Sequence, residues 1–320
     1  MKRTLKIAAL GAGLALASPM ATADTFVRMV SGPAGGSWYP LGAKIMQVMQ
    51  EDIKGIATSN GPGGGVGNIK EVSLGNAEIG WSYGHTAYNG YIGRGKFDKP
   101  YKNVRFFATL YPGVVQIAVP KSSSIKSIAD FNGKNISPGK AGWTGTAFAE
   151  TVLNGYGLSF DKIKQAGGTV HHVDYTDSVA LMKDGHIDVF IAVTSMPQAS
   201  FIDLNFKPGI RLIGIDPEKM KAIIKDNPGT FATKIPKGTY DGMDADVPTL
   251  ATATVMVVNK DLSDDLVYKM CKVFWKEHAT FAEVKKTWND VKLADALAAA
   301  AIPVHPGAER CYKELGVKKM

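Results

Sequence analysis

TFVRMVSGPAGGSWYPLGAKIMQVMQEDIKGIATSNGPGGGVGNIKEVSLGNAEIGWSY, the segment from Thr25 to Tyr83, determines the fold class. Three short runs are predicted to be strands, and a helical pattern begins after a glycine-rich turn in each of the two segments between them. The strand runs are Thr25–Val30, Ile56–Ser59 and Glu78–Tyr83. This βαβαβ order is typical of an α/β protein with a parallel sheet and helices on both faces.

The same alternation returns in the second half of the chain. The extended runs there are Val114–Val119, Asn135–Ser137, Val170–Asp174, Ile187–Val193 and Ile210–Ile215. Two similar α/β halves predict two lobes with a ligand cleft between them, because ligands of open α/β sheets bind beyond the carboxyl ends of the strands.

The last extended run, Ala251–Val258, is followed by a helical tail. Its predicted helices are Ser263–Glu277, Thr280–Trp288 and Ala294–Ala301. We therefore expect residues 24–112 and 256–320 to form lobe I and residues 113–255 to form lobe II. Two crossing strands near Tyr111–Gln116 and Thr249–Val255 would join the lobes and act as a hinge.

The first 23 residues have the layout of a secretory signal peptide. Lys2, Arg3 and Lys6 precede the uncharged segment Ile7–Ala17, and Ala21-Thr22-Ala23 supplies a cleavage pattern. A membrane anchor is the alternative, but spanning a bilayer takes roughly 20 apolar residues. We expect a mature periplasmic or secreted chain from about Asp24.

The charge distribution of the chain does not favour a nucleic acid as partner. The chain has 37 basic and 29 acidic residues, and loss of three basic residues with the leader leaves a formal net charge of +5. No run of five like charges occurs, so the sequence does not indicate nucleic-acid binding. A mildly positive field favours anionic solutes.

Cys271 and Cys311 are the only cysteines. In an oxidising compartment such a pair is usually bonded, so we expect a disulfide that ties the C-terminal tail to a helix. Free thiols are the alternative, and the spacing does not fit a metal site.

Glycine-rich loops precede three predicted helices, at residues 32–37, 61–67 and 139–146. Each brings the free N–H groups and positive dipole end of a helix near the strand ends. Three such ends could hold a carboxylate without arginine. The alternative for any single loop is a tight turn without a ligand.

Motifs of other chemistries are absent from the sequence. The loop at residues 61–67 does not fit the dinucleotide pattern, and no phosphate-binding loop or hydrolase signature occurs. His171 and His172 would point to opposite faces of a strand and would not share a metal. We therefore expect no catalytic residue, metal or cofactor.

The residues we expect at the ligand come from both lobes. They are Ser37, Tyr39, Gly65, Val66 and His85 from lobe I, and Trp143, Thr144, Gly145, Thr146 and Ser195 from lobe II. Backbone donors at residues 65–66 and 144–146 would hold carboxylates, and Tyr39 and Trp143 would form apolar walls. The alternative for His85 is a solvated loop histidine, and for Ser195 it is a helix N-cap. Trp38 and Tyr83 fit either the wall of a site or the core.

Several motifs in order resemble the TAXI family of solute receptors, which serve tripartite TRAP transporters. They are GGSWYPLG (35–42), GGGVGNI (63–69), LGNAEIG (74–80), SIADFNGK (127–134), MKDGHIDVF (182–190), IPKGTY (235–240) and DVPT (246–249). The resemblance covers nearly all of the mature chain.

The resemblance implies a type II periplasmic-binding fold, no catalysis, closure on one small solute, and a TRAP membrane permease as partner. The implied solutes are organic anions such as acidic amino acids and dicarboxylates. Gly65 and the stretch Tyr83-Gly84-His85 depart from the family pattern, which puts that specificity in doubt. An enzyme on the same bilobal fold and a secreted sensor are the alternatives.

Overall fold

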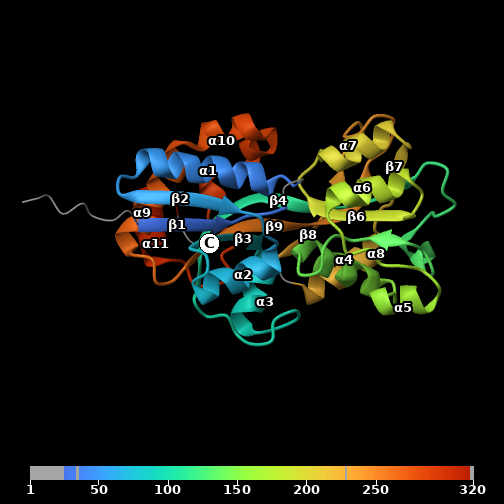
Figure 1. Cartoon of the computed structure of the whole chain (residues 1–320), viewed down its shortest axis with the longest axis horizontal. Coiled ribbons are helices and arrows are strands. Elements are labelled where there is room, and N and C mark those ends of the chain that lie inside the picture. The colour runs from blue at the N-terminus through green and yellow to red at the C-terminus, as the bar shows by residue number, and fades with distance from the viewer. Residues whose placement is uncertain (1–24, 34–35, 228, 318–320) are drawn as a thin grey trace, which may run out of the picture.

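The computed structural model describes residues 25–33, 36–227 and 229–317, so the predicted leader lies outside the described residues. The first lobe begins with three strands that alternate with three helices (Figure 1). They are β1 (Thr25–Val30), α1 (Trp38–Asp52), β2 (Ile56–Gly61), α2 (Gly65–Leu74), β3 (Ile79–Tyr83) and α3 (Gly84–Ile92). Strand β1 pairs in parallel with β2 and β3, as the βαβαβ pattern predicts.

Two long strands, β4 (Val104–Pro120) and β9 (Val247–Asn259), run side by side through both lobes (Figure 1). They pair antiparallel, from Val104 opposite Asn259 to Val114 opposite Ala251. Strand β3 pairs antiparallel with residues 254–258 of β9. The sheet is therefore mixed: the βαβαβ unit is parallel as predicted, but both long strands run antiparallel to their neighbours.

The second lobe is built on the other halves of the same two strands. Its elements are the 3₁₀ turn Ile128–Phe131, β5 (Ile136–Ser137), α4 (Thr144–Gly155), α5 (Phe160–Gln165), α6 (Tyr175–Lys183), β6 (Val189–Thr194), α7 (Ala199–Phe206), β7 (Ile210–Leu212), α8 (Pro217–Asp226) and β8 (Thr230–Ile235). The order through both lobes is β2-β1-β3-β9-β4-β6-β5, with β7 beside β4 and β8 beside β9. The predicted lobe boundaries within β4 and β9 stay a prediction.

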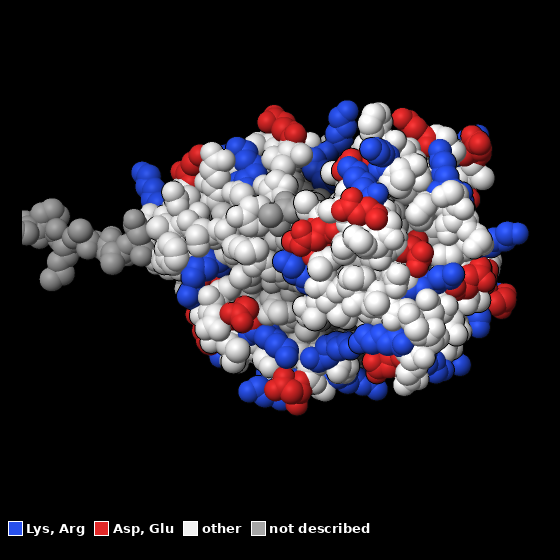
Figure 2. Space-filling model, turned by 45° about the vertical axis from the view of Figure 1, so that its right-hand side comes forward, with Lys and Arg blue, Asp and Glu red and all other residues white. Residues whose placement is uncertain are grey.

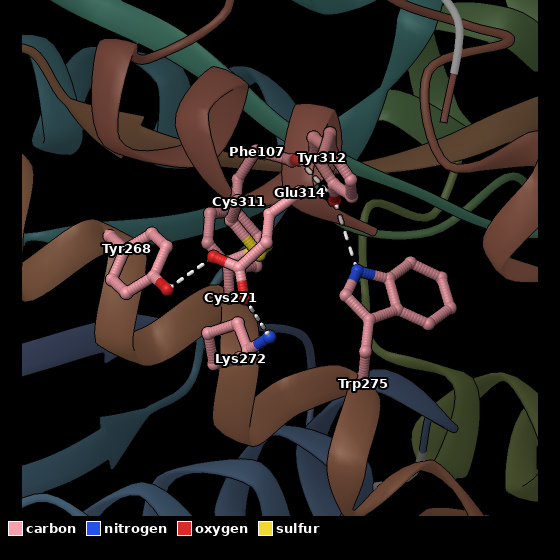
Figure 3. Close-up of a disulfide and its surroundings, with 8 residues drawn as sticks. All are labelled: Phe107, Tyr268, Cys271, Lys272, Trp275, Cys311, Tyr312 and Glu314. Atoms are coloured by element: carbon pink, nitrogen blue, oxygen red, sulfur yellow. Dashed lines mark hydrogen bonds and ion pairs between the residues drawn. A yellow bond between two sulfur atoms is a disulfide. The ribbon is translucent and has the colours of Figure 1, made fainter. Parts of the chain in front are cut away.

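The helical tail packs on the first lobe. It comprises α9 (Asp264–Lys276), α10 (His278–Val284), the 3₁₀ turns Lys286–Asp290 and Leu293–Asp295, and α11 (Pro306–Glu314). A disulfide joins Cys271 on α9 to Cys311 on α11, which confirms the predicted pair (Figure 3). Beside it, Glu314 accepts hydrogen bonds from Tyr268 and Lys272, and Tyr312 donates to the carbonyl of Phe107, 2.8 Å away. The disulfide and the Glu314 bonds join α9 to α11, and the Tyr312 bond attaches the tail to β4.

Two sequence predictions of secondary structure are wrong. Val170–Asp174 is not a strand: Val170 makes one isolated bridge to Ile136, and Asp174 is instead the N-cap of α6, where its carboxylate accepts from the backbone of Asp177. Ala294–Ala301 forms a 3₁₀ turn and further turns rather than a helix. The alanines favour a helix. However, the backbone N–H of Ala299 donates to the Thr109 hydroxyl on β4 rather than to a carbonyl within a helix.

Periodic apolar residues explain why the main helices form. Along α1, Leu41, Ile45, Val48 and Met49 recur at intervals of three to four and are all buried. A large apolar core fills the first lobe and reaches into the second, where a smaller cluster centres on Phe190 and Phe201.

The outer surface carries charges of both signs. Lysine, arginine, aspartate and glutamate side chains are interspersed on the face shown in Figure 2. Among the helices of the described ranges, none has the length and apolar character needed to cross a membrane.

Candidate functional site

A small cavity of about 40 Å³ lies where the two lobes meet. The residues that line it are Pro33, Gly36, Ser37, Trp38, Gly64, Gly65, Tyr83, Trp143, Thr144, Gly145, Tyr175, Val193 and Thr194. None of these described residues carries a charged side chain. One buried water needs roughly 10–15 Å³, so in this state the cavity has room for a compact group only.

Four helices begin at the cavity, and their first turns are not capped by side chains. The N-cap residues of α1, α2, α3 and α4 are Ser37, Gly64, Tyr83 and Trp143, and none makes a side-chain cap bond. Their first turns also contain no acidic residue. The N–H groups of a first helical turn have no partner within the helix.

Five helices that begin elsewhere have a side-chain cap. Helices α5, α6, α7, α9 and α11 each have an N-cap side chain that accepts from the first turn, whereas α8 and α10 do not. What distinguishes the cavity is that four helix starts without a side-chain cap meet at one place. The positive ends of the four dipoles favour an anion there.

Thr144 adds an unsatisfied polar group to the cavity. Its side chain is 1% exposed, and Oγ1 has no hydrogen-bond partner within the described part of the chain. A buried hydroxyl without a partner costs free energy. A ligand oxygen in the cavity would satisfy it.

Gly65 allows the two lobes to approach this closely. A Cβ atom at residue 65 would lie 2.0 Å from Oγ1 of Thr144, and one at Gly64 would lie 2.2 Å from the Trp143 ring. Only glycine lets the start of α2 contact the start of α4 in this way.

Hydrogen bonds across the cavity join the lobes. The Tyr83 hydroxyl donates to the carbonyl of Val193 over 2.8 Å. Ser195 donates to the hydroxyl of Ser37 over 3.3 Å, and Ser37 also accepts from Tyr111 over 3.2 Å. The structure therefore has the two lobes in contact around the cavity.

Aromatic rings form the walls. Trp38 packs edge-on against Tyr83 at 5.0 Å between ring centroids, and Trp143 packs edge-on against Tyr175 at 5.3 Å. Burial raises the pKa of Tyr175 to about 12 and that of Tyr83 well above its ordinary value. Both phenols stay protonated at neutral pH and act as hydrogen-bonding groups rather than as bases.

Five of the ten predicted residues line this one cavity. They are Ser37, Gly65, Trp143, Thr144 and Gly145. Ser195 adjoins it through its bond to Ser37, and its neighbour Thr194 is part of the lining. The structure thus brings together the starts of three predicted glycine-bordered helices.

The other four predicted residues lie outside the lining. Tyr39 is half-buried on α1, and its carbonyl accepts from Asn60. The Thr146 hydroxyl donates to the carbonyls of Pro138 and Lys140, so it stabilises the turn that precedes α4. Val66 and His85 line a neighbouring cleft of about 420 Å³ instead.

His85 is buried rather than a solvated loop residue. Its Nδ1 lies 3.0 Å from the Thr252 hydroxyl, and its Nε2 lies 3.1 Å from the Thr86 hydroxyl. Burial lowers its pKa to about 4, so the ring is neutral at neutral pH and does not supply a positive charge to an anion. At the rim of the same cleft, Lys96 and Glu150 form an ion pair at 2.8 Å between the loop after α3 and α4.

Sequence reasoning missed three lining residues, Tyr175, Val193 and Thr194. Val193 and Thr194 are the last residues of strand β6. They could have been predicted, because ligands of open α/β sheets bind at the carboxyl ends of the strands. Tyr175 follows the N-cap of α6, and no local pattern in the sequence distinguished it from a core residue.

Solved structures share this fold. One is a binding protein component of an ABC phosphonate transporter from Pseudomonas aeruginosa, with a TM-score of 0.53, 13% identity, and coverage of 82% of this chain and 79% of that chain. PhnD1 from Prochlorococcus marinus, solved with methylphosphonate, has a TM-score of 0.52, 11% identity, and coverage of 84% and 90%. XAC2383 from Xanthomonas citri, solved with ATP, has a TM-score of 0.51, 14% identity, and coverage of 92% and 95%.

The two lobes and the cavity between them define the type II periplasmic-binding-protein fold, the fold of solute receptors of transporters. Within that class, the chain belongs to the NMT1-like family, whose model matches residues 29–316. The assignment to the TAXI family is therefore corrected, and with it the expectation of a TRAP permease as partner.

Proposed function

We propose that the chain is a secreted solute-binding protein that captures a small organic anion between its lobes and delivers it to a membrane transporter component. One observation carries the proposal: four uncapped helix starts and the unpartnered Thr144 hydroxyl meet at one uncharged cavity. Export follows from the predicted leader in residues 1–23.

The lining supports binding rather than catalysis. Among the described lining residues there is no aspartate, glutamate, histidine, lysine or cysteine, and the two phenols are held protonated. General acid–base chemistry needs a group that titrates near the working pH. A site made of N–H donors and hydroxyls can bind an oxyanion, but it has no general acid or base that could transfer a proton in a reaction.

Binding would favour the state with the lobes in contact. Donors from α1, α2 and α3 lie on the first lobe, and those from α4 lie on the second. A ligand that contacts both sets stabilises the closed state by the interactions that the open state lacks.

A thermal-shift screen of the purified mature protein tests the proposal. The panel contains carboxylates, sulfonates, phosphonates and amino acids. A ligand at 100 times its dissociation constant should raise the unfolding free energy by about 2.7 kcal/mol. If no compound of any class shifts the transition, the proposed function is wrong.

The variant Thr144→Val tests whether the unpartnered Thr144 hydroxyl binds the anion. Valine keeps the shape of threonine and removes the unpartnered hydroxyl, so the unliganded protein should be as stable as the native one or more so. The affinity for the anion should fall about tenfold, the equivalent of one hydrogen bond to a charged group. Thr151→Val on the same helix is the control, because the Thr151 hydroxyl bonds to the carbonyl of Ala147 and lies outside the central cavity.

A further inference from the structure

The backbone groups that the four helix starts present at the cavity have one electrostatic character. The starts of α1, α2, α3 and α4 present N–H donors and positive dipole ends. A helix N-terminus carries the equivalent of about half a positive charge. An ammonium group placed among four such ends would meet repulsion.

No negative side chain compensates for this field. The described lining residues include no carboxylate. The carbonyl of Val193, a potential acceptor, already accepts from Tyr83. A cationic group in the cavity would lose its hydration without gaining a counter-charge.

The acidic side chains of the adjoining clefts are already paired. Asp174 lies in the outer groove beyond Trp143, 3.3 Å from Lys140, and accepts from the backbone of Asp177. Glu150 lies in the neighbouring cleft and pairs with Lys96. Neither is part of the central lining, and the charge of each is already balanced by a lysine.

From this one-sided electrostatic environment we infer that the solute is an organic acid that carries no ammonium group. This inference rests on the proposed function and narrows it, since it selects carboxylates, keto acids and hydroxy acids over α-amino acids. The oxyanion lies between the starts of α2 and α4, near the Thr144 hydroxyl, and the carbon skeleton contacts the aromatic walls.

Matched ligand pairs test the inference by isothermal titration calorimetry. Each pair has one carbon skeleton with and without the amino group: propionate and alanine, succinate and aspartate, glutarate and glutamate, 3-phenylpropionate and phenylalanine. For any skeleton that binds, the amino acid should bind at least about 100-fold more weakly, because like charges brought together are strongly unfavourable.

One further ligand distinguishes the effect of net charge on affinity from the effect of the ammonium group. Glutaramate has the same net charge of −1 as glutamate but no ammonium group, so it should bind at least about tenfold more tightly than glutamate. If glutamate or another amino acid binds as tightly as its matched acid, the inference is wrong while the proposed function stands. If no member of any pair binds and the wider screen is also negative, the proposed function itself fails.

Ser37→Asp tests the electrostatic cause. Aspartate is a good N-cap residue, so α1 should still form. The new carboxylate would weaken glutarate binding and offer an acceptor to an ammonium group, and the ratio of glutarate to glutamate affinity should fall at least about tenfold. The uncharged Ser37→Asn variant should keep the native ratio; an unchanged ratio in Ser37→Asp would contradict the inference.

Discussion

Tyr83 donates its phenolic hydrogen to the backbone carbonyl of Val193, 2.8 Å away, and so connects the end of β3 in the first lobe to the end of β6 in the second. The two residues are 110 positions apart in the sequence. Both line the central cavity, so the bond that joins the lobes is also part of the wall of the proposed binding site.

Tyr83→Phe should weaken ligand binding about fivefold, the effect of losing one neutral hydrogen bond of about 1 kcal/mol. The ring contacts with Trp38 and His85 remain, so the unliganded fold should keep its stability. Titration calorimetry measures the change. Tyr101→Phe is the control, because the Tyr101 hydroxyl bonds only locally to Asp98. Equal affinities of the native and Tyr83→Phe proteins would contradict a role of this bond in closure.

Gly65→Ala should reduce affinity at least about tenfold. The added methyl group would lie 2.0 Å from Oγ1 of Thr144 when the lobes are in contact, and this clash disappears when they separate. It would also lie 3.0 Å from the Ser82 hydroxyl within the first lobe, which would have to shift slightly. Gly67→Ala is the matched control on the same helix, since a Cβ atom there meets no other atom within 4 Å, and it should keep the native affinity.

Acid should destabilise the protein through His85. Burial depresses the pKa of its ring to about 4, so between pH 6.5 and pH 4 the unfolded state binds more protons than the folded state. The contribution of His85 is fully present above pH 6.5 and is lost as the pH falls toward 4, with a loss of roughly 2 kcal/mol at pH 5. Urea unfolding at pH 8 and pH 5 measures this loss.

His85→Gln should remove that part of the pH dependence, since glutamine does not titrate. His186→Gln, at an exposed position on the second lobe, should retain the full native difference between pH 8 and pH 5. If His85→Gln shows the same pH dependence as the native protein, the ring is not buried in the folded state.

The Cys271–Cys311 disulfide should contribute about 3–4 kcal/mol to stability, because it closes a segment of 40 residues. Guanidinium unfolding with and without a reducing agent measures the difference, and the paired Cys271→Ala and Cys311→Ala variant should be insensitive to the reductant. Ligand affinity should stay the same in all cases, since both cysteines lie in the tail outside the cavity lining. A loss below 1 kcal/mol on reduction would contradict the prediction.

Local pattern sufficed to predict the β1-α1-β2-α2-β3 unit, because glycine turns and apolar periodicity act within a few residues. Helix α3 was missed. Its sequence, GHTAYNGYI, has two glycines and little helical propensity, and it is stabilised by burial of Gly84, His85, Thr86, Ala87 and Gly90. Similarly, Pro112 and Gly113 suggest a turn, yet β4 continues through them because a register shift at residues 109–112 accommodates the missing N–H.

For the site, the sequence indicated which helix starts could bind an anion but not which side chains would surround it. Gly65 and Thr144 were predictable because each lies in a glycine-rich loop at the start of a helix. Tyr175 and the contact of Tyr83 with Val193 depend on how one lobe meets the other, which is a long-range relationship that no local pattern contains.

The pairing of β4 with β9 continues through the region where the lobes meet, with Pro112 opposite Ala253 and Gly113 opposite Thr252. Such a two-stranded ribbon can twist and bend, but it cannot lengthen or slip without breaking its ladder of hydrogen bonds. A slip by one residue would shift one lobe against the other by about 3.3 Å. Such a shift is larger than the 2.8 Å length of the hydrogen bond between the Tyr83 hydroxyl and the Val193 carbonyl, so it would break that bond. The alignment of these two backbones therefore keeps the same atoms of the two lobes opposite one another, and a strand ladder outside the cavity lining helps to fix the geometry of the proposed binding site.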